Sequence, residues 1–253
     1  MTPAYEATDI TPDYVSVYGF TAVPASASSL LFSVTTSTAA PFIPVSEVPF
    51  PDTVLSKRIK RYAQSHLPVP TYNHSLRVYH YGLAIKKHLF PSWEFTDETY
   101  FLTCLLHDIG STEENITKTK LSFEFHGGLL ALSVLQETSN TSAPEATASR
   151  ELAESVAEAI IRHQDFRDKG QITAVGQLLQ LATVLDNIGA HTELVHPSTI
   201  EDISRHFPRQ GWSRCFAATL RKETELKPWS HTTVLGEEAP ARVLENKVMA
   251  PYE

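Results

Sequence analysis

Five ionisable residues fall on helix faces that their neighbours should bury, and their spacing directs them toward one core. His74, His163 and Asp186 each belong to an apolar stripe with the spacing of one helix face. His107 and Asp108 are adjacent and close the most hydrophobic helix of the chain. The apolar members of the three stripes are Val78, Tyr81 and Ile85 for His74, Val156 and Ile160 for His163, and Leu178, Leu179 and Ala182 for Asp186.

Such a set predicts a metal site. A buried carboxylate without a partner costs on the order of several kcal/mol, or it binds a proton. A divalent cation removes this cost by holding carboxylates and neutral imidazoles together. These donors suit Zn, Mn, Fe or Co, and the chain has only two cysteines for a thiolate site. Taken singly, each residue also has a structural explanation: Asp186 would pair with Arg77 or Arg162, and Asp108 would end a helix.

Long helices must position these residues, and the absence of proline from 92–143 and 145–196 leaves room for them. Thr71 is expected to cap one helix, and Ser111 with Glu114 to form a capping box at the start of another. Hydrophobic periodicity predicts helices at about 52–66, 71–90, 97–109, 122–138, 149–166, 174–191, 199–206 and 211–223.

Because strand signals are weak, we expect an all-α fold with one helical domain over residues 51–253, C-terminal tail included. Residues 1–50 are rich in Pro, Ser and Thr and predict a mostly irregular arm, with its second half packed on the domain. Residues 139–149 are expected to form a surface loop. The pair Gly127-Gly128 lowers helix propensity by roughly 1 kcal/mol per residue, which suggests close packing there.

Composition narrows the possible partners. The net charge is 21 − 29 = −8, which argues against nucleic acid or an anionic membrane surface as a partner. No apolar run approaches the roughly 18 residues of a membrane span. The first 50 residues contain no Lys or Arg, so neither a secretory nor a mitochondrial signal is expected, and cytoplasm is the default.

Short segments around these residues resemble a known superfamily. Asn73-His74-Ser75-Leu76-Arg77, Leu105-Leu106-His107-Asp108-Ile109-Gly110 and Leu185-Asp186-Asn187 are similar to the H…HD…D signature of HD-domain proteins. Further segments resemble the fungal cyanamide hydratases of that superfamily, over roughly residues 19–253. They are Thr21-Ala22-Val23-Pro24, Phe123-Glu124-Phe125-His126-Gly127-Gly128, Ala159-Ile160-Ile161-Arg162-His163, Phe207-Pro208-Arg209-Gln210-Gly211-Trp212 and Lys227-Pro228-Trp229-Ser230-His231.

The resemblance implies an HD-domain helical bundle, a single zinc ion and the hydration of cyanamide, a small molecule, to urea. By the same resemblance His74, His107, Asp108 and Asp186 would hold the zinc, with iron or manganese less expected. HD proteins of this kind are often oligomeric, so a homo-oligomer is possible. A substrate of three heavy atoms implies a small pocket.

Several residues are candidates for proton transfer and substrate contact. His163 is our first candidate for the general acid and base, and Glu124, at the start of a helix, is the second. His126 replaces a residue that is usually Tyr in the cyanamide hydratases; it would either contact substrate or hold a second metal with His163. Arg77 and His231 are further candidates for the substrate site. The other six histidines, at 66, 80, 88, 191, 196 and 206, are expected to be solvated.

Two other functions compete with the hydratase. An HD-type phosphohydrolase acting on a nucleotide would need cationic contacts, and no dense basic cluster lies near the motifs. A non-enzymatic scaffold held together by metal is disfavoured because structural zinc sites favour cysteine.

Overall fold

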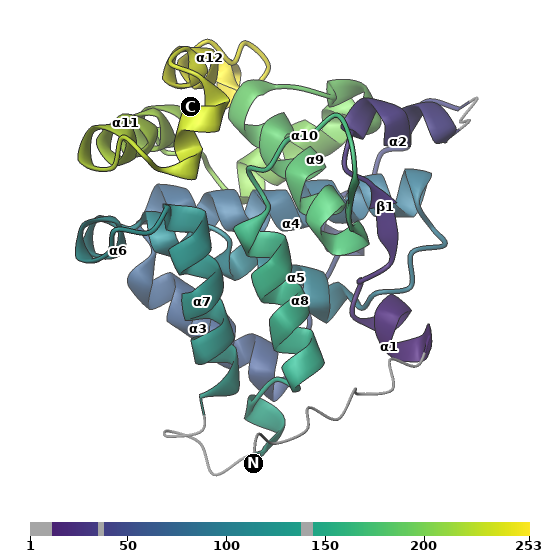
Figure 1. The fold of residues 1–253 in the computed structure, drawn as a ribbon. Coiled ribbons are helices and arrows are strands. Elements are labelled where there is room, and N and C mark those ends of the chain that lie inside the picture. Colours follow the sequence, from purple (N-terminus) through teal and green to yellow (C-terminus); the bar gives the residue numbers. More distant parts are fainter. Residues whose placement is uncertain (1–11, 35–37, 138–143) are drawn as a thin grey trace, which may run out of the picture.

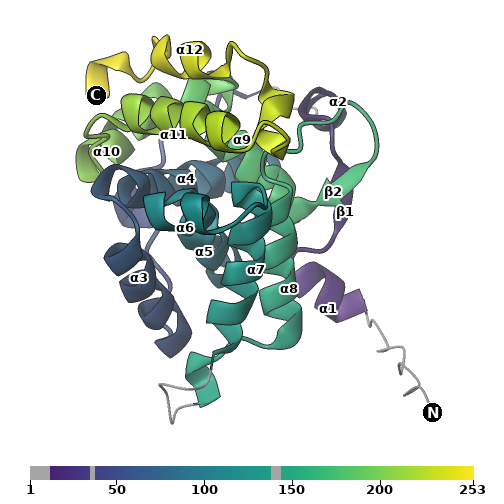
Figure 2. The ribbon, with the colours of Figure 1, turned by 60° about the vertical axis from the view of Figure 1, so that its left-hand side comes forward.

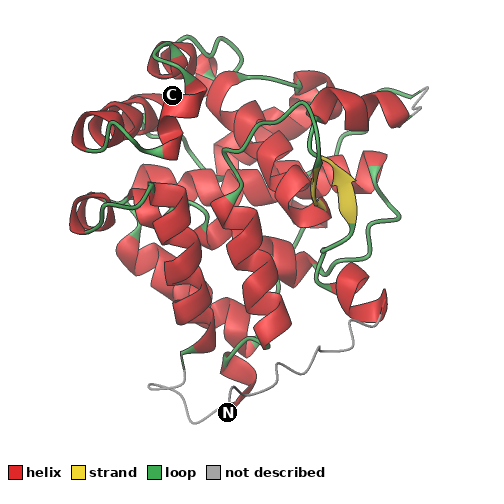
Figure 3. Ribbon diagram, in the orientation of Figure 1, coloured by secondary structure: helices red, strands yellow, loops and turns green. Residues whose placement is uncertain are grey.

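The structure, a computed structural model, describes residues 12–34, 38–137 and 144–253, and its regular secondary structure there is almost entirely helical (Figures 1 and 3). The all-α prediction is confirmed. In chain order the α-helices are α1 Pro12–Val17, α2 Ala27–Ser33, α3 Val54–His66, α4 Val69–Leu89, α5 Asp97–Leu106, α6 Glu113–Lys118, α7 Phe123–Gln136, α8 Arg150–Ile161, α9 Ala174–Ile188, α10 Pro197–His206, α11 Trp212–Leu226 and α12 Ala239–Leu244. Short 3-10 turns lie between them: η1 Val45–Glu47, η2 Ile109–Ser111, η3 Pro144–Ala146, η4 Thr192–Leu194, η5 His231–Leu235 and η6 Ala250–Tyr252.

Helices α4, α5 and α9 form the centre of the molecule, and each of them is buried along most of its length. Helix α4 starts at Val69, two residues before the predicted cap at Thr71. Pro70 falls in the first turn, where the missing N–H of proline costs no helical hydrogen bond. The prediction of Thr71 as the cap is therefore wrong, and this residue is buried within the helix.

Helix α5 ends earlier than its predicted end at about residue 109. The helix ends at Leu106, so His107 and Asp108 lie in the turn that leads to η2. The cap of α6 is Thr112, whose hydroxyl oxygen accepts from the backbone N–H of Asn115 at 3.2 Å. The predicted capping box on Ser111 is therefore wrong by one residue.

Glycines allow the turn after α5 to approach α7, and α7 to approach α8, as the Gly127-Gly128 pair suggested. A Cβ added to Gly110 would lie 2.0 Å from the carbonyl oxygen of Phe123, and one added to Gly128 would lie 2.5 Å from a side-chain carbon of Ile161. Gly127 lies against the backbone of Gly110. This contact fixes the turn that carries His107 and Asp108 to the start of α7.

The N-terminal part contributes two short helices, one turn and one strand to the described structure. Strand β1, Ala22–Pro24, pairs antiparallel with β2, Gln171–Thr173, in the register Ala22↔Thr173. Among the buried side chains of this part are those of Val23, Leu30 and Ile43. The predicted surface loop at 139–149 lies partly outside the described residues.

Helices α11 and α12 pack together at one end of the molecule, opposite the lower ends of α3, α7 and α8 (Figure 2). Trp212, Phe216, Ala217, Leu220 and Val243 form a second apolar cluster there. None of the described helices is long and apolar enough to cross a membrane.

Candidate metal centre

Three of the predicted ligands meet at the centre of the molecule. His74 comes from the second turn of α4, and His107 and Asp108 come from the turn after α5; each is at most 2% exposed. The Nε2 atoms of the two imidazoles are 3.3 Å apart. Oδ2 of Asp108 is 3.2 Å from Nε2 of His107 and 3.7 Å from Nε2 of His74. One atom of each residue thus faces a common point, as ligands of a single ion would.

The other nitrogen of each imidazole ring is already bonded. Nδ1 of His74 lies 2.6 Å from Oδ2 of Asp186, and Nδ1 of His107 lies 2.8 Å from the carbonyl oxygen of Cys104. Because a carboxylate and a carbonyl only accept hydrogen bonds, Nδ1 carries the proton in both rings. In the neutral form of each ring, Nε2 therefore carries no proton and has a lone pair available as an acceptor or metal ligand.

These lone pairs point at one another and at a carboxylate, an arrangement that suits a cation. Oδ2 of Asp108 is buried and has no hydrogen-bond partner among the described residues. Burial lowers the pKa of His74 to about 4, against the influence of Asp186, so this ring is neutral at pH 7. Burial would also lower the pKa of His107, but the carboxylate of Asp108 outweighs it and raises that pKa. The same negative charge would attract a metal ion, and the donor set fits one.

The fourth predicted ligand, Asp186, lies outside this cluster of ligand atoms. Its carboxylate accepts from Nε and Nη2 of Arg77, at 3.0 and 2.9 Å, and from Nη1 of Arg209 at 2.7 Å. The two guanidiniums and His74 hold the pKa of Asp186 well below its ordinary value, although burial would raise it. In this position Asp186 orients the ring of His74 from behind the cluster.

Arg77, a candidate for substrate contact, is wholly buried in this network. Besides Asp186, its guanidinium donates to the carbonyl oxygen of Phe207 at 3.0 Å. Arg209 was missed as a site residue, since a buried arginine looks like a surface one in sequence. Its Nε donates to Glu253 at 2.7 Å.

An aromatic side chain also holds His74, and the sequence did not single it out. Trp212 stacks on the ring of His74, with centroids 4.1 Å apart, and its indole N–H donates to Asn187 at 2.9 Å. The Phe207–Trp212 segment, noted for its resemblance to the cyanamide hydratases, therefore supplies two residues that hold this side of the cluster.

His163 joins the cluster from the turn after α8. Its Nδ1 lies 2.6 Å from the carbonyl oxygen of Ile160 and therefore carries the proton of the neutral ring. Nε2, which has the lone pair, lies 3.9 Å from Oδ1 of Asp108. The ring centroids of His163 and His107 are 5.3 Å apart. Burial and the nearby ring of His107 lower the pKa of His163.

Glu124 and His231 form a pair beside this group. Glu124 is fully buried in the first turn of α7; its Oε1 lies 2.7 Å from Nδ1 of His231, while Oε2 has no partner among the described residues. The hydrogen bond to Glu124 raises the pKa of His231. The backbone N–H of His231 donates to Ser122, so the C-terminal tail folds back onto the start of α7 as expected.

Two histidines lie elsewhere than the sequence suggested. His126 is half-buried and belongs neither to the cluster nor to the cavity described next. His80, expected to be solvated, is 1% exposed. Its ring lies between Phe50 and Phe207, with centroids 5.2 and 5.0 Å away, and neither nitrogen has a partner among the described residues.

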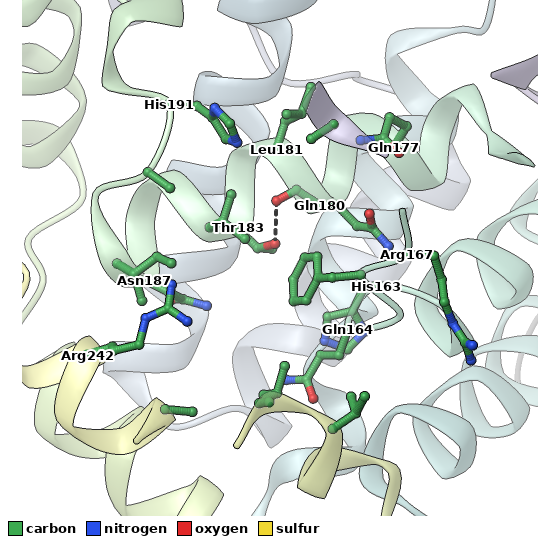
Figure 4. Close-up of a pocket in the computed structure, with 18 of the residues that line it drawn as sticks. His163, Gln164, Arg167, Gln177, Gln180, Leu181, Thr183, Asn187, His191 and Arg242 are labelled. Atoms are coloured by element: carbon green, nitrogen blue, oxygen red, sulfur yellow. Dashed lines mark hydrogen bonds between the residues drawn. The ribbon is translucent and has the colours of Figure 1, made fainter. Parts of the chain in front are cut away.

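A cavity of about 500 Å³ opens onto the cluster, larger than the small pocket expected from the sequence (Figure 4). His107, Asp108 and His163 belong to its lining, so Asp108 faces open space on one side. Gln180 and Thr183 of α9, Gln164 of the turn after α8 and Arg242 of α12 surround the same space. A cluster with three protein donors and an open side matches catalytic zinc sites better than closed structural ones.

Comparison with known proteins agrees with this geometry. The HD domain family model matches residues 71–188, the segment that carries His74, His107, Asp108 and Asp186. Two proteins of Saccharomyces cerevisiae, cyanamide hydratase DDI2 and cyanamide hydratase DDI3, are each 39% identical to the chain over 232 residues. The match covers 92% of this chain and 98% of each relative. The chain therefore belongs to the cyanamide hydratase family of HD-domain proteins.

Proposed function

We propose that the protein is a metal-dependent hydratase that adds water to the nitrile of cyanamide to give urea. The observation that carries this proposal is the group of ligand atoms from His74, His107 and Asp108, which face a common point beside an open cavity, with Oδ2 of Asp108 lacking a hydrogen-bond partner among the described residues. In this reaction the oxygen of water bonds to the nitrile carbon, and both protons of water end on the former nitrile nitrogen. No redox change is involved.

The metal in this proposal is zinc, held by His74, His107 and Asp108. Asp186 belongs to the site as the carboxylate that fixes His74 through Nδ1. When bound, zinc would lower the pKa of a water molecule towards about 7 and polarise the nitrile.

His163 is the proposed acid and base. Its proton on Nδ1 is held by Ile160, so Nε2 accepts a proton from water and returns one to the developing imidate nitrogen. It belongs to the cavity lining, which Glu124 does not. Glu124 is the second candidate for this role: its Oε1 is bonded to His231, and its Oε2 has no hydrogen-bond partner among the described residues.

The charges near the cluster favour a neutral substrate over a nucleotide. Arg77 pairs with Asp186, and Arg162 and Arg167 pair with Asp165, while Arg242 of the cavity lining is a solvent-exposed side chain on α12. An HD phosphohydrolase would need such groups free for phosphate. We expect the protein to act in the cytoplasm on a small molecule, with neither nucleic acid nor membrane as its partner; a homo-oligomer remains a prediction from the resemblance alone.

The test is urea formation from cyanamide by the purified, zinc-loaded protein. His107→Ala is expected to abolish it, because the variant loses one of the three protein donors to the metal. His66→Ala, which changes an exposed histidine, is the control and should retain full activity. Cleavage of nucleoside monophosphates with no turnover of cyanamide would overturn the proposal in favour of the phosphohydrolase.

A further inference from the structure

The carboxylate that orients His74 is held by a residue outside the HD domain match. Nη1 of Arg209 donates to Oδ1 of Asp186 at 2.7 Å and to the carbonyl oxygen of Asp186 at 3.1 Å. Arg209 lies beyond residues 71–188, the part of the chain that the HD domain model matches. Since Asp186 bonds to Nδ1 of His74, whatever fixes Arg209 is linked to a ligand of the proposed metal.

Arg209 is not needed to balance the charge of Asp186. Arg77 alone donates to both oxygens of that carboxylate, at 3.0 and 2.9 Å, and supplies one positive charge. Arg209 adds a second positive charge, and another carboxylate offsets it: Oε1 of Glu253 accepts from Nε of Arg209 at 2.7 Å. The two guanidiniums and the two carboxylates therefore carry no net charge together.

Glu253 holds Arg209 by two routes. Arg209 is wholly buried, and its Nη2 donates to Oγ of Ser213 at 3.0 Å. The hydroxyl of Ser213 in turn donates to Oε1 of Glu253 at 2.6 Å. The same carboxylate oxygen thus fixes the guanidinium directly and through Ser213, so Arg209 cannot turn without breaking several hydrogen bonds at once.

The segment that carries Glu253 is anchored. It follows α12 and ends beside the start of α11 (Figure 2). Nδ2 of Asn246 donates to the carbonyl oxygen of Asp186 at 3.1 Å, and Oδ1 of Asn246 accepts from the backbone N–H of Met249 at 3.1 Å. The side chain of Met249 is fully buried in the main core. Glu253 therefore reaches Arg209 from a segment that is fixed to α9 and to the core.

We propose that Glu253 is a positioning residue of the metal site, an inference that rests on the proposed function. By hydrogen bonds Glu253 fixes Arg209, Arg209 fixes Asp186, and Asp186 holds the ring of His74 with Nε2 toward the ion. Without Glu253 these side chains gain freedom that zinc binding must remove again. The entropic cost of that ordering lowers the affinity for zinc.

The first arm of the test measures zinc affinity by competition with a chelator, starting from the apoproteins. Glu253→Ala is expected to bind zinc about tenfold more weakly than the wild type. Glu253→Gln should lose no more than about threefold, because its amide oxygen still accepts from Arg209 and Ser213. Glu245→Ala, at an exposed glutamate just before the segment, is the matched control and should keep the wild-type affinity. Thermal unfolding of the apoproteins confirms that the variants fold.

The second arm tests the route through Arg209. Arg209→Met alone is expected to weaken zinc binding at least tenfold, and the double variant with Glu253→Ala should bind zinc within about twofold of Arg209→Met. In the wild-type apoprotein, NMR should show the Nδ1–H of His74 as a slowly exchanging proton, because it is bonded to a buried carboxylate. In Glu253→Ala this proton should exchange with water at least tenfold faster.

The outcomes separate this inference from the proposed function. If the wild type binds zinc and hydrates cyanamide while Glu253→Ala matches it in zinc affinity and in exchange of the His74 proton, the inference is wrong and the proposed function stands. Equal losses of affinity in Glu253→Gln and Glu253→Ala, or a further tenfold loss in the double variant, would also overturn the inference. A wild-type protein that binds no zinc would overturn the proposed function and the inference with it.

Discussion

Two aspartates are buried at the centre of this molecule, and their surroundings differ in a way that separates their roles. Asp186 accepts hydrogen bonds from two buried guanidiniums and from His74. Asp108 faces the imidazoles of His74 and His107, and its Oδ2 has no hydrogen-bond partner among the described residues. A carboxylate that is already neutralised fixes geometry, whereas one that is not attracts a cation.

The first prediction removes the carboxylate that lacks a guanidinium. Asp108→Ala is expected to lose zinc and to reduce urea formation to below about one-thousandth, because the variant loses both a ligand and the negative charge of the cluster. Metal analysis and a urea assay on the same sample measure both effects. Thermal unfolding should show that the apoprotein of this variant is as stable as the wild-type apoprotein. If Asp108→Ala retained one zinc per chain, the proposed difference in role between Asp108 and Asp186 would be wrong.

The second prediction removes the neutralised carboxylate. Asp186→Ala leaves Arg77 buried without a counter-charge and Arg209 paired with Glu253 alone, so the free energy of unfolding should fall by about 3–5 kcal/mol. Because His74 also loses its orienting partner, metal affinity should fall by about ten- to a hundredfold. Chemical denaturation and metal titration give the two values. If zinc is lost completely at unchanged stability, Asp186 is a ligand and the distinction drawn here is wrong.

The third prediction concerns the cavity side of Asp108. His163→Gln is expected to keep its metal and to lower kcat for urea formation by about a hundredfold, since the proton acceptor is lost while the cluster remains. His126→Gln, which changes a half-buried histidine outside the cluster, is the matched control. Loss of zinc in His163→Gln would instead make this residue a ligand.

A buried histidine away from both aspartates gives the smallest predicted effect. Burial, followed by the charge of His206, lowers the pKa of His80 to about 3, so this ring is neutral in the folded protein. The unfolded chain, with a histidine pKa of about 6.5, binds a proton that the folded chain does not. The contribution of His80 to the free energy of unfolding is therefore full above pH 6.5. It is lost as the pH falls from 6.5 toward 3, by about 1.4 kcal/mol per pH unit.

His80→Phe should therefore make stability less sensitive to acid. Between pH 7 and pH 5 the variant is expected to lose about 2 kcal/mol less than the wild type, as measured by urea denaturation at each pH. His66→Phe, at an exposed position, should keep the pH dependence of the wild type. An unchanged slope in His80→Phe would show that the buried ring is protonated in the folded protein.

The sequence was sufficient to predict α3, α4, α5 and α7 to α11, and to place His74, His107, Asp108 and His163 in one core, because helical periodicity marks buried faces directly. It did not predict the short helices α1, α2, α6 and α12. It was not sufficient to predict the surroundings of Asp186. Arg209 reaches that carboxylate from a segment 23 residues further along the chain, and no local pattern shows this pairing.

His80 was misjudged for a related reason. Polar residues on a helix usually mark its solvated side, but helix α4 is covered by α3, α5, α9, α10 and α11, and Phe50 covers the ring of His80. The size of the cavity could not be predicted from the sequence either. Its walls come from α2, α9, α11, η5 and α12, and their separation depends on packing that the sequence pattern does not contain.

The most direct test of the metal centre is a zinc titration of chelator-treated protein, with urea formation from cyanamide recorded at each step. We predict that activity is absent at the start, rises in proportion to added zinc and stops rising at one zinc per chain. Full activity in protein with less than about 0.1 metal per chain would contradict the role assigned to His74, His107 and Asp108.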